Sequence, residues 1–206
     1  MRQLLITTAA AFFLVGCGPS DIHQAVIKGD VKSIKSFLDS GVNVNTKKKY
    51  NKTPLALAAE VQNDFNYYRF RGGNPIELSH NNHKEIVELL ISKGATINQE
   101  QSDTEGETPW YAVRGENPLY FAVESEGSLE AIKSQYETLL NIGKFTKEEY
   151  NYRMKILDGY ISDYREIIKT LVDNGADVNA KGKYNLPLVD YATEHTKSLL
   201  LKLGAK

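Results

Sequence analysis

Apolar residues recur every three or four positions in several stretches of the chain, a spacing that predicts amphipathic helices. In the clearest stretch, Ile86, Leu89 and Leu90 fall on one stripe. Three stretches share the pattern, and each is followed three residues later by a glycine, a residue that commonly ends helices in a left-handed conformation. The stretches and their glycines are 33–38 with Gly41, 85–91 with Gly94, and 166–172 with Gly175.

Prolines at Pro54, Pro118 and Pro187, each followed by leucine, predict where other helices begin. Proline fixes its own φ and lacks an N–H that the first helical turn would leave unpaired, so it suits a helix start. Thr53 is expected to cap the helix that Pro54 opens. The small alanines that follow favour close packing of this helix against a partner helix; they are Ala56, Ala58 and Ala59.

The glycine-to-proline interval also recurs. Gly41 lies 13 residues before Pro54, and Gly175 lies 12 residues before Pro187. The motifs Thr-Pro-Leu at 53–55 and Gly-Ala-Asp-Val-Asn at 175–179 resemble the ankyrin repeat, which has a period of about 33 residues and opens on Thr-Pro-Leu-His-x-Ala. The resemblance implies an all-α ankyrin-repeat solenoid of about four helix-pair repeats over residues 21–206, with the first opening at about Asp21.

Two repeats are longer than this consensus allows. Pro54 to Gly94 spans 40 residues and Pro118 to Gly175 spans 57, whereas the resemblance implies about 20. We therefore expect two large helical or loop insertions, at about 62–80 and 127–163. The second is expected to form a helical hairpin or two elongated helices. Each half has an apolar face, Gly143 interrupts the pattern, and Thr146 and Glu149 have capping-box spacing.

The first insertion and the loop before Pro118 contain aromatic and arginine residues, the types that dominate binding hot spots. The alternative is that the rings cover lengthened helices, and the sequence leaves both interpretations open. The candidate partner-binding residues are Tyr67, Tyr68, Arg69, Phe70, Arg71, Trp110 and Tyr111.

Residues 1–16 have the pattern of a secretion signal. Arg2 provides the positive start, and the apolar run that follows is about 12 residues long, too short for a bilayer-spanning helix of roughly 20. The four residues at 14–17, Leu-Val-Gly-Cys, resemble the lipobox of bacterial lipoproteins. The resemblance implies lipidation at Cys17, with 17–20 as a lipidated tether to the membrane. The alternative is a plain secretory signal.

Lipidation would account for Cys17 as the only cysteine of an exported protein, because one sulfur cannot build a disulfide framework. Several acyl chains on one residue also make a stable anchor. Gly18 is not the aspartate that retains enterobacterial lipoproteins in the inner membrane. We therefore expect the protein at the periplasmic face of the outer membrane.

Composition and charge exclude several function classes. The chain has 206 residues, 41% hydrophobic and 25% charged, which is typical of one globular domain. A net charge of −1 gives no reason to expect a nucleic-acid partner. His80 and His83 are near neighbours, but a closed zinc site needs four ligands, so we expect no metal and no cofactor. The carboxylates are expected to be scattered over solvated helix surfaces without a buried convergent pair, so no enzyme is predicted.

A stack of repeats leaves a concave face and a row of loops, which favours protein binding. We expect an immunity protein that binds and neutralises a toxic effector. Three features together support this expectation: export, a lipid anchor, and insertions that give the surface a shape specific to one partner. This combination resembles lipoproteins that guard against secreted phospholipase effectors of the type VI system, so the partner is expected to be a secreted toxin such as a lipase effector. The alternative is an envelope ankyrin protein that supports a periplasmic enzyme or a stress response.

Overall fold

The computed structural model describes residues 18–48, 52–60, 82–99, 117–182 and 186–206. Within these ranges the chain is helical and has no strand, as expected for an all-α fold; Lys181 and Pro187 form an isolated β-bridge. The helices are α1 (Ile22–Ile27), α2 (Val31–Asp39), α3 (Pro54–Ala59), α5 (His83–Ser92), α6 (Pro118–Asn141), α7 (Lys147–Asp173), the 3-10 helix η3 (Leu188–Asp190) and α8 (Glu194–Lys202).

Two of the three prolines open α-helices, as the sequence predicts. Thr53 caps α3 by accepting a hydrogen bond from the Ala56 N–H over 3.2 Å, and Asn117 caps α6 in the same way. Pro187 differs, because only the three-residue η3 follows it. Thr193 already caps α8, so the short interval leaves no room for a helix and a turn between them.

The glycines that end the predicted helices have the expected left-handed backbone. Gly41, Gly94 and Gly175 have φ values of 92°, 84° and 95°. This region is costly for residues with a Cβ, so glycine at these positions allows the chain to leave each helix.

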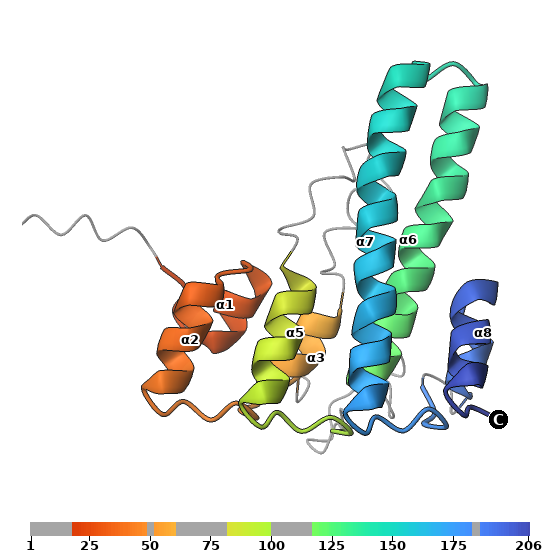
Figure 1. Cartoon of the computed structure of the whole chain (residues 1–206). Coiled ribbons are helices and arrows are strands. Elements are labelled where there is room, and N and C mark those ends of the chain that lie inside the picture. Colours follow the sequence, from red (N-terminus) through yellow and green to blue (C-terminus); the bar gives the residue numbers. More distant parts are fainter. Residues whose placement is uncertain (1–17, 49–51, 61–81, 100–116, 183–185) are drawn as a thin grey trace, which may run out of the picture.

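The described helices pack in pairs, and the pairs lie side by side (Figure 1). α1 packs on α2, α3 on α5, and α6 on α7; α3 also contacts α1 and α6, while α5 contacts α7. This arrangement is consistent with an ankyrin repeat. The number of repeats stays a prediction, because residues 61–81 and 100–116 lie outside the described ranges.

The buried face of α5 differs by one residue from the predicted stripe. Ile86, Val87 and Leu90 are buried, whereas Leu89 is half-buried and packs at the edge of the core. α5 therefore turns the positions at i, i+1 and i+4 inward, because α3 and α7 contact it from two sides.

Helices α6 and α7 are much longer than their neighbours, at 24 and 27 residues, and together rise beyond the rest of the stack (Figure 1). The helical character expected for residues 127–163 is confirmed. Thr146 and Glu149 form the predicted capping box, and Gly143 turns the chain with φ 70°. Whether this length is an insertion into a repeat stays a prediction. Across the described residues, no helix combines the length and apolar character that crossing a bilayer requires.

Candidate interaction surface

Three asparagines join neighbouring helix pairs along the base of the stack. Asn45 donates from Nδ2 to the Gly94 carbonyl over 3.3 Å and accepts from the Thr96 N–H over 2.7 Å. Asn98 repeats both contacts with Gly175 and Asp177, at 2.8 and 2.9 Å. Asn45, Asn98 and Asn179 form what we call the asparagine ladder.

The asparagine ladder fixes the spacing between pairs because each side chain binds the turn that ends the next pair. Asn179 continues it by accepting from the Lys206 N–H over 2.9 Å. In the sequence, these asparagines lie four residues after Gly41, Gly94 and Gly175. The recurring position of these asparagines can be seen in the sequence, but the groups that their side chains bind cannot.

A buried carboxylate lies where the long hairpin leaves the stack. The side chain of Glu126 is fully buried, and Arg165 donates from Nε to its Oε1 over 2.9 Å. Arg165 also donates from Nη2 to Glu130 Oε1 over 2.8 Å. Two carboxylates therefore converge on one guanidinium, and the expectation that carboxylates are only scattered over solvated surfaces is wrong here.

This cluster joins the hairpin to the last helix. Thr193 donates from Oγ1 to the other oxygen of Glu126 over 2.9 Å while it accepts the Thr196 N–H that begins α8. Both oxygens of Glu126 are therefore engaged. Because Arg165 on α7 and Thr193 at the start of α8 both donate to this carboxylate, Glu126 positions α6, α7 and α8 relative to one another.

The two described histidines near the inner side of the stack are structural. His23 is buried, and its Nε2 lies 3.2 Å from the carbonyl oxygens of Thr46 and Lys52. Burial lowers the pKa of His23. His83 Nδ1 lies 3.0 Å from the carbonyl of Ala58. Carbonyls only accept, so these nitrogens carry the proton.

Nothing in the described ranges groups three or more histidine, cysteine, aspartate or glutamate side chains closely enough to hold a metal ion. His80, the other half of the weak His-x-x-His pattern, lies outside those ranges.

Helix α3 offers almost no surface to a partner. All six of its residues are buried, and its sequence, Pro-Leu-Ala-Leu-Ala-Ala, is apolar on every side. A partner that contacts the middle of the stack must therefore reach loops or other helices.

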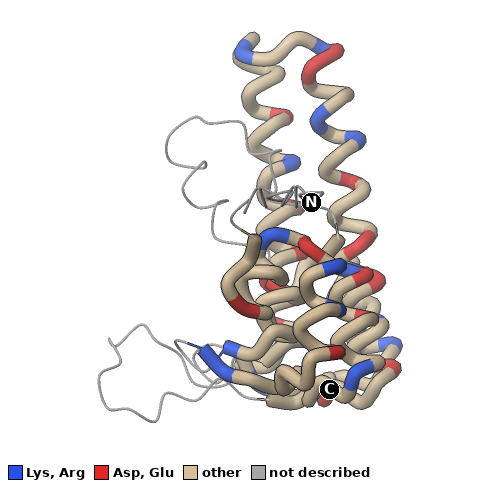
Figure 2. The backbone as a smooth tube through the Cα atoms, turned by 90° about the vertical axis from the view of Figure 1, so that its left-hand side faces the viewer, with Lys and Arg blue, Asp and Glu red and all other residues tan. Residues whose placement is uncertain are grey.

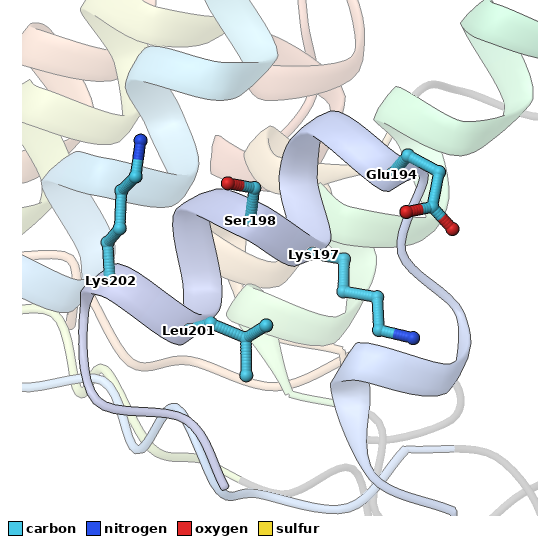
Figure 3. A pocket seen from close by; sticks show the side chains of 5 residues that line it. All are labelled: Glu194, Lys197, Ser198, Leu201 and Lys202. Carbon is cyan, nitrogen blue, oxygen red and sulfur yellow. The ribbon is translucent and has the colours of Figure 1, made fainter.

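The outer face of α8 has a shallow hollow of about 400 Å³ (Figure 3). Leu201 is half exposed there, between Lys197 and Lys202. The lining residues all come from α8, so no second element walls the hollow; they are Glu194, Lys197, Ser198, Leu201 and Lys202.

The site residues predicted from the sequence all lie outside the described ranges. Their roles stay predictions; the residues are Cys17, Tyr67, Tyr68, Arg69, Phe70, Arg71, Trp110 and Tyr111.

A family model described as ankyrin repeat matches residues 71–101, which supports an ankyrin-repeat protein. Ankyrin repeats are typically non-catalytic modules for protein–protein interaction, and no enzyme family is indicated.

Two curated proteins from Latrodectus tredecimguttatus are similar to the chain. Alpha-latrocrustotoxin-Lt1a is 30% identical over 146 residues, which cover 59% of this chain and 10% of the toxin. Alpha-latroinsectotoxin-Lt1a is 31% identical over 120 residues, which cover 58% of this chain and 7% of the toxin. The chain thus spans a tenth or less of the length of these relatives.

Proposed function

We propose, from the ankyrin-repeat character of the chain, that it binds and neutralises a toxic effector protein at the bacterial cell envelope. The observation that carries this proposal is the hairpin of α6 and α7, which extends a small repeat stack with a long projecting arm. Repeat stacks bind proteins, and an extension that one of the described helix pairs carries gives the surface a shape suited to a particular partner.

The proposed location is the periplasmic face of the outer membrane. It rests on the lipobox-like residues that end at Cys17 and on the short apolar run before them. In this proposal the acyl chains on Cys17 hold the stack at the membrane, where a toxin that acts on lipids, such as a secreted phospholipase, would be met. The similarity to the two Latrodectus toxins does not identify this partner.

The aromatic and arginine residues named from the sequence are proposed contacts. Alanine at Tyr67, Tyr68, Arg69 or Trp110 should weaken effector binding by about 2 kcal/mol at a true hot spot. The melting temperature should change little if the rings face the partner. A large fall in melting temperature with unchanged affinity would assign the rings to the core instead.

The decisive experiment is deletion of the gene followed by challenge with each secreted toxin encoded beside it. Deletion should sensitise the cells to one of these toxins, and the wild-type chain should restore resistance. A Cys17→Ser variant should leave the membrane fraction without unfolding. If deletion leaves the cells resistant to every such toxin, immunity is wrong. Isolation of a stoichiometric complex with a periplasmic enzyme would then favour the alternative, an envelope ankyrin protein that supports that enzyme.

A further inference from the structure

The free end of the long hairpin exposes large apolar side chains. Ile142 is 62% exposed and Tyr152 is 67% exposed, the highest values for large hydrophobic residues in the described part of the chain. Both lie near the turn between α6 and α7, far from the stack (Figure 1). We call residues 141–155 the hairpin end.

The backbone of the hairpin end is held in place by local contacts. Gly143 makes the turn, and the capping box of Thr146 and Glu149 starts α7. The guanidinium of Arg153 lies 4.6 Å from the ring centroid of Phe145, and Lys147 Nζ lies 4.9 Å from that of Tyr150. A surface ordered before binding loses less conformational entropy when a partner docks.

The hairpin end is also basic. It contains four cationic side chains and two acidic ones, whereas the whole chain has a net charge of −1. Figure 2 shows Lys and Arg segments gathered around this end of the hairpin. One of the two acids, Glu149, accepts the Thr146 N–H over 2.9 Å. The cations are Lys144, Lys147, Arg153 and Lys155.

Exposed tyrosine and isoleucine on a segment with a net positive charge match an acidic protein surface with apolar depressions. An anionic bilayer has the same sign of charge but matches less well. Glu148 and Glu149 stand in the first turn of α7, so Ile142 could enter the apolar part of a bilayer only if two nearby carboxylates were also taken out of water. A protein surface can receive the apolar side chains in depressions and leave both carboxylates in solvent.

We propose that the hairpin end docks on an acidic patch of the effector protein, with Ile142 and Tyr152 entering apolar depressions on that patch. This inference rests on the proposed function and names the surface and the chemistry of its partner. The electrostatic part of the contact predicts faster association at low salt, because opposite charges steer the encounter.

The experiment uses the full chain and the toxin whose effect it suppresses, produced as a catalytically inactive protein. Titration calorimetry compares wild type with Ile142→Asp, with Tyr152→Ala, and with a double charge reversal, Lys144→Glu and Lys155→Glu. Each apolar variant should weaken binding by about 30-fold or more. The charge reversal should weaken binding and remove most of its salt dependence.

The matched control is Leu201→Asp on α8, which changes an exposed leucine at the far end of the stack and should leave affinity unchanged. All substituted residues are exposed, and circular dichroism checks that each variant is folded.

Three results would overturn the inference. If the hairpin-end variants bind the toxin as tightly as wild type, the docking surface is wrong while immunity stands. If the wild-type chain neither suppresses nor binds any of the toxins, the proposed function fails as well. A co-sedimentation assay with vesicles of three parts POPC to one part POPG tests the membrane alternative. If the variants keep their affinity for the toxin but no longer sediment with the vesicles as wild type does, the hairpin end binds a membrane instead.

Discussion

The backbone N–H of Asp177 donates to the side-chain oxygen of Asn98 over 2.9 Å, although 79 residues separate them in the chain. The same carboxamide donates to the Gly175 carbonyl over 2.8 Å. Asn45 makes the equivalent pair of bonds one helix pair earlier. One side chain thus satisfies a donor and an acceptor of the following turn, which sets the distance between successive helix pairs.

Replacing Asn98 with alanine should destabilise the stack by about 1–2 kcal/mol, because two hydrogen bonds between helix pairs are lost at a partly solvated site. Urea unfolding measures the loss. Asn151→Ala is the matched control, since Asn151 is exposed on α7, and its effect should stay within about 0.5 kcal/mol. Equal effects of the two substitutions would show that the asparagine ladder does not stabilise the stack.

Replacing Arg165 with alanine should cost about 3–5 kcal/mol, because it leaves the fully buried Glu126 without its cation. Replacing both residues with methionine should recover most of that stability, since the buried charge is then absent. Urea unfolding of the single and double variants checks this. If Arg165→Ala costs under 1 kcal/mol, the cluster does not join the hairpin to the stack.

Two glycines of the hairpin should respond to alanine with opposite signs. Gly143 has φ 70°, where a Cβ is strained, so Gly143→Ala should destabilise by about 1 kcal/mol. Gly159 lies within α7, and nothing stands within 4 Å of its added Cβ. Gly159→Ala should therefore stabilise by about 0.5–1 kcal/mol. Urea midpoints would contradict this if both substitutions moved stability in one direction.

The pH dependence of stability should include a contribution from Asp21. The hydrogen bond from Lys48, with that from the Gln24 N–H, lowers the pKa of Asp21 from 3.8 to about 2. The unfolded chain therefore takes up the proton first as pH falls. The stabilisation is present above pH 3.8 and is lost as pH falls to about 2.

An NMR titration of the Asp21 carboxyl carbon measures this pKa directly. Lys48→Met should raise the pKa toward its ordinary value and flatten the fall in stability between pH 4 and pH 2. A midpoint near 3.8 in the wild-type chain would contradict the assignment.

The local features of the fold could be predicted from the sequence because they depend on residues a few positions apart. The Thr53 cap, the capping box of Thr146 with Glu149, and the left-handed glycines at helix ends are interactions within one turn. The repeated glycine-to-proline interval then indicated helix pairs. The partner-binding residues named from the sequence lie outside the described ranges, so that part of the site stays a prediction.

Tertiary structure alone decided which polar and apolar side chains are buried. Nothing in the local pattern sets Glu126 apart from the solvated glutamates, because its partner Arg165 is 39 residues away on another helix. Leu89 fits the apolar period of α5 yet lies at the edge of the core, whereas Ile142 and Tyr152 stay exposed where the hairpin outruns its neighbours. Periodicity fixes which residues share a face of a helix, but burial depends on whether another element covers that face.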